Sequence, residues 1–222
     1  MEAAKKLKVF FEADLDESPV SLDWSSCGRW LAVMDVNSSV LLVDTELGKG
    51  RNPWLAHKGG GLGLAWHPSL PMFATSCEDG VVKLWVIDDN LSVNEKKEIK
   101  LKKNSSSSWI EFLKWRPDGR QLAAGLGNSV KLLSNEGIIE LSFQFSGGTV
   151  ADVAWHPKGS LLGISGYGGI TIHNVSDPKG KPINLKRKGS ILSLSWSPDG
   201  KYIVAGCQDN AVHLWRFRTR DD

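Results

Sequence analysis

The fold of this chain is decided by the stretch LSWSPDGKYIVAGCQDNAVHLW, Leu194 to Trp215. Apolar runs around Trp196 and Ile203 flank a Pro-Asp-Gly sequence, in which Pro fixes φ at one corner and Gly accepts a positive φ. A second set of turn residues, Gln208-Asp209-Asn210, precedes a third apolar run. The stretch therefore predicts a meander of short antiparallel strands joined by tight turns.

The same pattern recurs along the chain. An apolar stretch, a Trp, a few residues that often include Pro, a Gly and a second apolar stretch occur five times. Successive copies are 40 to 49 residues apart, close to the roughly 40 to 45 residues of a four-stranded propeller blade. The tryptophans that mark the copies, called marker tryptophans below, are Trp24, Trp66, Trp115, Trp155 and Trp196.

The array resembles the WD-repeat family over nearly the whole chain. The similarity is best in FATSCEDGVVKLW, Phe73 to Trp85, and in IVAGCQDNAVHLW, Ile203 to Trp215, each a strand, a turn and a strand that ends in Trp. In the family Asp usually follows that Trp, whereas Val86 and Arg216 follow it here. The resemblance implies an all-β fold, a β-propeller of four-stranded antiparallel blades of unequal quality.

We expect a single propeller domain over residues 1–222. Rings of this family usually have about seven blades, and an N-terminal strand often completes the last blade. Residues 7–12 are the candidate for such a strand, so closure with five blades is formally available. The taper of the blades favours a larger ring, so we expect an incomplete ring from a truncated protein, with an exposed apolar side on the fifth blade. The expected blades are approximately 16–50, 57–103, 108–146, 148–186 and 189–217.

Blades of the family often carry a buried hydrogen-bond network of His, Ser or Thr, Asp and Trp. The resemblance implies such a network in the second copy and part of one in the fifth, where Lys188 and Gly189 stand in place of the His. Its role is structural, because it satisfies buried polar groups and fixes one arrangement of the blade. The residues concerned are His57, Thr75, Asp79, Trp85, Asp209 and Trp215.

Composition and motifs argue against catalysis, cofactors and metals. The formal net charge of +2 gives no strong field toward nucleic acid or membrane, and no apolar run approaches the roughly 18 residues of a membrane span. His67 and His156 fill the same slot after a marker tryptophan, which predicts packing or turn chemistry instead of a metal site. Cys77 and Cys207 occupy equivalent strand positions and are predicted to be inert core thiols.

Two segments interrupt the repeat. Residues 88–108 mix charge with a serine run that suits a loop, and residues 178–188, PKGKPINLKRK, are basic. The basic segment suits an acidic partner, and a solvated surface connection is the alternative interpretation. Basic and aromatic residues do not alternate in the manner of a nucleic-acid platform.

The resemblance implies a protein–protein interaction scaffold without catalysis, whose blade loops and channel mouth hold other proteins. One alternative is a substrate receptor of a cullin-type ubiquitin ligase, because Trp215-Arg216-Phe217-Arg218 is similar to the Trp-Asp-x-Arg of that class except at Arg216. Another is a truncated isoform with little activity alone. An enzyme would need convergent acidic, His or Ser groups on the channel loops, which the sequence does not offer. Scattered cysteines and the lack of a signal-peptide pattern predict the cytoplasm, the nucleus or both.

Overall fold

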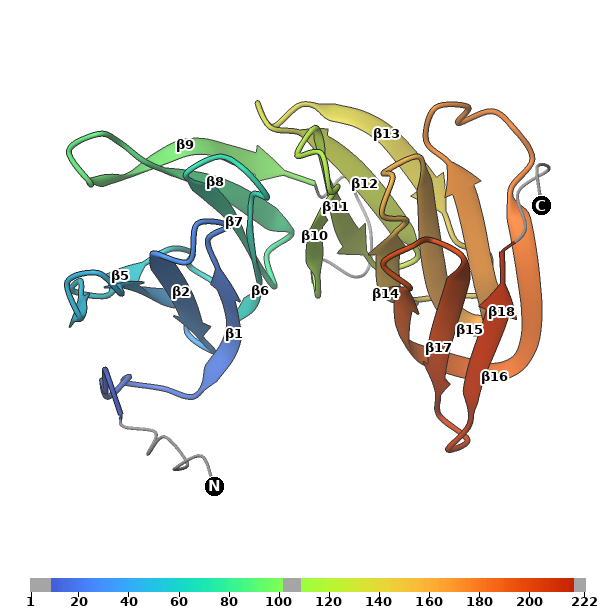
Figure 1. Ribbon diagram of the computed structural model, residues 1–222, viewed down its shortest axis with the longest axis horizontal. Coiled ribbons are helices and arrows are strands. Elements are labelled where there is room, and N and C mark those ends of the chain that lie inside the picture. The colour runs from blue at the N-terminus through green and yellow to red at the C-terminus, as the bar shows by residue number, and fades with distance from the viewer. Residues whose placement is uncertain (1–8, 102–108, 218–222) are drawn as a thin grey trace, which may run out of the picture.

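The structure, a computed structural model, describes residues 9–101 and 109–217. Within these residues the chain forms strands, turns and connections and contains no helix. The strands make four antiparallel sheets, so the expected all-β fold of antiparallel blades is confirmed (Figure 1). Short runs of Val, Ile, Leu, Trp and Phe become strands because they pack well on pleated surfaces, and the intervening Gly, Pro and Asp residues make the turns.

The first three blades are separate meanders. In the first blade the fourth strand is divided in two, and both short pieces pair with the third strand. The strands of the first blade are β1 (Pro19–Trp24), β2 (Trp30–Asp35), β3 (Ser39–Asp44), β4 (Lys49–Gly50) and β5 (Trp54–Leu55). Those of the second are β6 (Gly61–Trp66), β7 (Met72–Cys77), β8 (Val81–Ile87) and β9 (Val93–Lys100). Those of the third are β10 (Leu113–Trp115), β11 (Gln121–Leu126), β12 (Ser129–Ser134) and β13 (Ile139–Gln144).

The fourth and fifth blades share one sheet. It contains β14 (Val150–Trp155), β15 (Leu161–Asn174), β16 (Ile183–Trp196), β17 (Tyr202–Cys207) and β18 (Val212–Arg216). The first part of β16 pairs with β15 as the outer strand of the fourth blade, and the second part pairs with β17 as the first strand of the fifth. Because this strand passes from one blade to the next, four sheets hold five blades.

The long strand β15 is a hairpin. The Val175 N–H donates to the Ser160 carbonyl at 2.9 Å, so the two ends of β15 lie side by side. The chain reverses at residues 167–169, where Gly168 and Gly169 have φ values of 91° and 133°. Only glycine adopts such values readily, which explains the Gly-Gly pair at this turn.

The blades follow one another around an open arc, and the described residues do not close a ring (Figure 1). The first strands of neighbouring blades are in contact, from β1 to β6, β6 to β10, β10 to β14 and β14 to β16. Residues 9–12 form no strand, and Phe10 and Phe11 lie beside Gly48 and Gly50 of the first blade. Residues 7 and 8 lie outside the described residues, so the closing strand at 7–12 stays a prediction.

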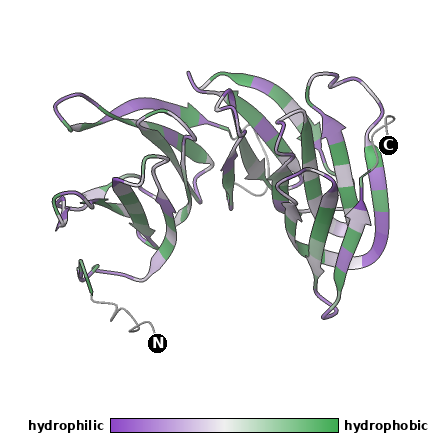
Figure 2. Cartoon of the chain, viewed as in Figure 1, coloured by the Kyte–Doolittle hydropathy of each residue, from purple (hydrophilic) through white to green (hydrophobic). Residues whose placement is uncertain are grey.

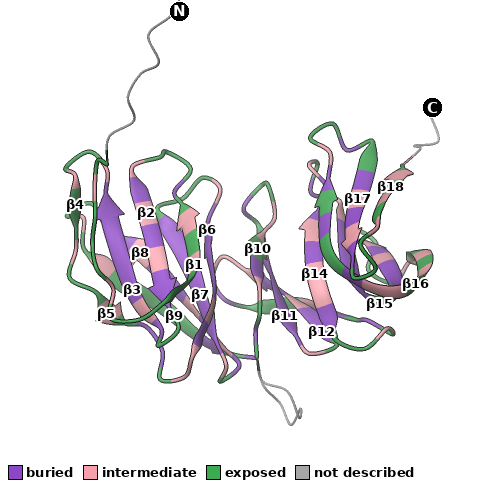
Figure 3. Cartoon of the chain, turned by 90° about the horizontal axis from the view of Figure 1, so that it is seen from below, coloured by how far each residue is buried: buried purple, intermediate pink, exposed green. Residues whose placement is uncertain are grey.

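The core lies between blades. Four clusters of buried apolar side chains each combine residues of two neighbouring blades, which makes every blade depend on the next. Strands β7 and β11 are buried along their whole length, and the hydrophobic bands of the sheets are plain in Figure 2. Figure 3 shows that exposed residues gather at the turns and on the outer strands. On the fifth blade the side chains of Leu192, Val212 and Leu214 are exposed.

Candidate interaction surface and the residues that support it

A buried network joins three of the four predicted residues in the second blade. His57 Nε2 lies 2.7 Å from Thr75 Oγ1, and Trp85 Nε1 donates to the same oxygen at 2.9 Å. Since Thr75 belongs to β7 and Trp85 to β8, the network ties the segment before β6 to two inner strands. Burial lowers the pKa of His57 to about 4, so its ring is neutral at pH 7.

Asp79, the fourth predicted member, stands apart. No hydrogen bond joins it to His57 in the described part of the chain, and its carboxylate lies against Gly59 instead. A Cβ atom on Gly59 would stand only 2.7 Å from Asp79 Oδ1. Asp79 therefore acts on His57 only through its negative charge, which raises the pKa of His57 and so partly offsets the effect of burial.

In the fifth blade Asp209 and Trp215 are not joined to each other. Arg187 Nη2 donates to both carboxylate oxygens of Asp209, at 2.7 and 2.9 Å, and this bond lowers the pKa of Asp209. Trp215 packs against the apolar core between the fourth and fifth blades. Arg187 stands nine residues before the marker Trp196, as the histidine of the second blade does before its own marker. The spacing from the marker tryptophan would therefore have placed Arg187 at the position equivalent to His57, which the sequence analysis assigned to Lys188 and Gly189.

The marker tryptophans bond neighbouring blades together. In three of them the indole N–H donates to the carbonyl of the residue just before the marker of the preceding blade. These bonds run from Trp115 to Ala65 at 3.2 Å, from Trp155 to Lys114 at 3.0 Å and from Trp196 to Ala154 at 3.2 Å. The indole N–H of Trp66 is buried and has no such partner among the described residues. The repeat thus sets both the strands and the contacts between blades.

His67 and His156 make a second set of bonds between blades. His67 Nε2 lies 2.9 Å from the Gly119 carbonyl, and His156 Nε2 lies 3.3 Å from the Gly200 carbonyl, each in the Pro-Asp-Gly turn of the next blade. Backbone N–H groups donate to Nδ1 of both rings, so the neutral ring carries its proton on Nε2 and donates to the carbonyl. Burial lowers the pKa of both histidines. These contacts support a structural role for both side chains.

Two aspartates that the sequence did not single out also join blades. Asp23 Oδ2 accepts a hydrogen bond from the backbone N–H of Trp66 at 2.8 Å. Asp152 Oδ2 accepts one from the backbone N–H of Leu194 at 2.9 Å. Each carboxylate thus satisfies a backbone donor in the first strand of the next blade. They stand at different distances from their own marker tryptophans, so no fixed spacing signals them.

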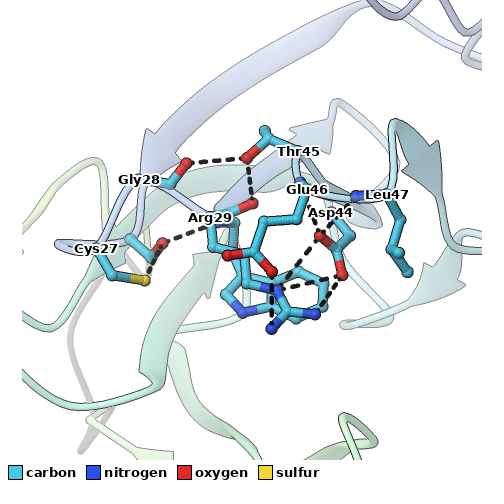
Figure 4. Close-up of polar contacts among 9 residues, drawn as sticks. Cys27, Gly28, Arg29, Asp44, Thr45, Glu46 and Leu47 are labelled. Carbon is cyan, nitrogen blue, oxygen red and sulfur yellow. Dashed lines mark hydrogen bonds and ion pairs between the residues drawn. The ribbon is translucent and has the colours of Figure 1, made fainter.

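A charged cluster holds the first blade together (Figure 4). Arg29 Nη2 donates to Asp44 Oδ2 at 2.8 Å and lowers the pKa of Asp44, while Glu46 lies 3.2 Å from Arg29 Nη1. The Thr45 hydroxyl donates to the carbonyls of Gly28 and Arg29 at 3.1 and 2.8 Å. Asp44 is the last residue of β3, the position at which the family has the Asp of its Trp-Asp pair. That position in the repeat could have identified Asp44 as a structural residue from the sequence.

The three cysteines are free thiols in different surroundings. Cys77 and Cys207 are buried, and burial raises the pKa of Cys77. Cys27 is exposed, and a contact with the Ser25 hydroxyl at 3.4 Å lowers the pKa of Cys27. Among residues 9–101 and 109–217 no group of three or more His, Cys, Asp or Glu side chains could hold a metal ion.

A cavity of about 670 Å³ lies at the outer edge of the fourth blade and is called the edge cavity below. Residues 145–147, the hairpin of β15 at 167–171 and residues 184–188 of β16 line it. Of the basic segment 178–188, residues 184–188 thus line the edge cavity and residues 178–183 do not. Tyr167 is 65% exposed at its rim, and Lys186 and Lys188 are exposed beside it.

Two other predicted features are only partly within the described residues. Arg218 of the Trp-x-x-Arg ending lies outside them, while Arg216 is exposed in β18. Residues 102–108 of the first interrupting segment lie outside them as well. In the described part of the chain no helix is long and apolar enough to cross a membrane.

Comparison with known families finds two matches to the family described as WD domain, G-beta repeat, at residues 53–86 and 182–216. The first match spans nearly all of β6 to β8 of the second blade, and the second spans β16 to β18, so both fall on the two copies that resemble the family best. Two segments of the chain thus match the WD repeat, and the antiparallel blades of the structure agree with that match.

Curated relatives are similar over part of their length. Cell division cycle 20.1, cofactor of APC complex, from Arabidopsis thaliana is 29% identical over 111 residues, covering 48% of this chain and 24% of that protein. Protein HIR1 of Candida albicans is 21% identical over 229 residues, covering 89% and 25%. Transcriptional corepressor LEUNIG_HOMOLOG of Arabidopsis thaliana is 27% identical over 165 residues, covering 72% and 20%. The chain spans about a quarter or less of the length of these relatives.

Proposed function

We propose that this chain is a protein–protein interaction scaffold with no catalytic activity of its own. The observation that carries the proposal is that its buried polar side chains form hydrogen bonds that stabilise the fold. His57, His67, His156, Asp23 and Asp152 all bond within a blade or to the next blade. Side chains engaged in this way stabilise a rigid arrangement, and they are not free to act as acids, bases or nucleophiles.

The surface that remains for partners consists of turns, outer strands and the edge cavity. Exposed residues gather at the turns and on the outer strands (Figure 3), which the apolar core between the blades holds in place. The relatives include one named as a cofactor of a complex and one named as a transcriptional corepressor, which supports a role in holding other proteins. The same relatives and the free thiols support action in the nucleus or the cytoplasm.

Other proteins are the proposed partners, and neither nucleic acid nor membrane is expected. The basic segment 178–188 contains four lysines, one arginine and no acidic residue, and it suits an acidic partner. A rigid scaffold of this kind binds through a few anchor residues on one face, so only part of the surface should contribute strongly to affinity.

The proposal is tested by affinity capture with the whole chain, followed by purification of each captured protein and titration against the chain by calorimetry. We expect at least one protein to bind with a defined stoichiometry. If no purified protein binds stoichiometrically, or if the chain turns over a small substrate without a partner, the scaffold function is wrong.

A further inference from the structure

We propose that the edge cavity binds an extended acidic peptide segment of a partner protein. Carboxylates of the peptide would pair with Lys186 and Lys188, and an apolar side chain between them would lie beside Tyr167. The proposal rests on the scaffold function and narrows it to one site and one class of ligand.

The lysines of the edge cavity are free to pair with a ligand. Within the described residues neither Lys186 nor Lys188 forms an ion pair, and the nearby Asp209 is already bound by Arg187. The outer strand of the second blade, β9, differs because it carries carboxylates among its lysines. Its Glu95 lies 2.7 Å from Lys83 of β8, and its Lys96 lies 2.8 Å from Glu136 of the third blade. Residues 183–188 of β16 thus contain no acidic residue to balance their positive charge, whereas β9 contains Glu95 and Glu98.

The cavity also holds a buried donor without a partner. The Arg187 side chain is only 11% exposed, and its Nη2 is engaged with Asp209. Its Nε is buried and has no hydrogen-bond partner among the described residues. Because this Nε is buried, it is not exposed to a ligand in the cavity, and Asp209 holds the guanidinium in place beside the cavity.

The backbone of β16 suits an extended ligand. Its residues up to Ser190 pair with β15, and those from Ile191 pair with β17. Residues 183–188 therefore keep one edge without a strand partner in the described part of the chain. An extended peptide can add to such an edge through main-chain hydrogen bonds.

The floor and rim of the cavity are apolar and aromatic. Phe145 and Ile170 are buried in the floor, Leu185 is half-buried, and Tyr167 stands exposed at the rim. A Cβ atom at Gly169 would lie 2.1 Å from the Leu185 carbonyl oxygen, so only glycine fits beside the floor. An apolar anchor between charged contacts is the usual composition of a peptide site.

A peptide fits these features better than a nucleic acid does. A nucleic-acid strand needs a long basic track with several aromatic stacking surfaces. The edge cavity offers one exposed aromatic ring, Tyr167, and the net charge of the whole chain is only +2. A volume of about 670 Å³ accommodates a few side chains.

The test is a fluorescence-polarisation titration of the whole chain with a short fluorescein-labelled peptide in which glutamates alternate with leucine and phenylalanine. We expect saturable binding that weakens with added salt, and about tenfold or greater loss of affinity for Lys186→Glu/Lys188→Glu and for Tyr167→Ser. The matched control is Lys179→Glu/Lys181→Glu, which changes the charge of the same segment equally outside the cavity and should bind nearly as well as the unchanged chain. A peptide with glutamine in place of glutamate should bind at least about tenfold more weakly.

Three results would overturn the proposal. These are no saturable binding, equal loss of affinity for the two double variants, and tighter binding of a single-stranded oligonucleotide or inorganic phosphate that displaces the peptide. The scaffold function is tested separately, because a captured protein that still binds Lys186→Glu/Lys188→Glu with unchanged affinity would leave that function standing while removing the edge cavity as its site.

Discussion

Acidification should destabilise the second blade through His57. The native pKa of His57 is about 4, because its ring is buried, whereas an unfolded histidine has a pKa of about 6.5. Between these values the unfolded chain binds a proton that the native chain does not, so stability falls as the pH drops from about 6.5 to about 4 and levels off below that. The two pKa values differ by about 2.5, and each pH unit is worth about 1.4 kcal/mol, which gives a loss of about 3 kcal/mol.

The measurement is the free energy of unfolding from urea titrations at a series of pH values between 7 and 4. The matched variant is His57→Gln, whose amide can still bond Thr75 and does not titrate. Other histidines whose pKa is also lowered by desolvation contribute to both proteins alike. The unchanged chain should lose about 3 kcal/mol more than the variant over this range. Equal losses in the two proteins would refute the buried, neutral state of His57.

Three further predictions concern glycine, tryptophan and cysteine. Gly119→Ala should lower the free energy of unfolding by about 3 kcal/mol, because the residue has a φ of 73° and a Cβ there would clash with the His67 ring. Gly28→Ala should lower it by about 1 kcal/mol, because Gly28 has a φ of 75° but open space around it. Equal urea midpoints for the two variants would contradict this prediction. Trp155→Phe should lower the free energy of unfolding by about 1 kcal/mol more than Trp66→Phe does, because only Trp155 donates an indole hydrogen bond. Equal shifts of the melting temperature in the two variants would argue against this prediction. A thiol reagent should label Cys27 in the native chain and reach the other two thiols only after unfolding, which mass spectrometry of digested chain would show.

The strands and the contacts between blades could be predicted to the extent that they depend on short, repeated patterns. Each marker tryptophan ends a first strand, and Gly119 and Gly200 have the positive φ that the Pro-Asp-Gly turns predict. His57, Thr75 and Trp85, which the resemblance singled out in the second copy, lie within hydrogen-bonding distance of one another through the Thr75 hydroxyl. Local sequence was sufficient here because turn chemistry and alternating burial act within a few residues.

Features that depend on distant segments could not be predicted. The edge cavity needs residues 145–147, 167–171 and 184–188 to meet, and nothing in their sequences specifies that meeting. The passage of β16 from the fourth blade to the fifth is also invisible in the repeat, because both halves read as ordinary strands. Asp79 stands at the expected position, yet it lies against Gly59, a contact that spacing alone does not determine.

Hydrogen exchange of the chain, free and bound to a purified protein partner, tests the central claim most directly. If the blades are a rigid scaffold that presents the edge cavity, partner binding should slow exchange at residues 167–171 and 183–188 and leave the buried strands β7 and β11 unchanged. Protection confined to other surfaces would contradict the assignment of the site. Exchange that slows throughout the buried strands on binding would contradict the rigid scaffold itself.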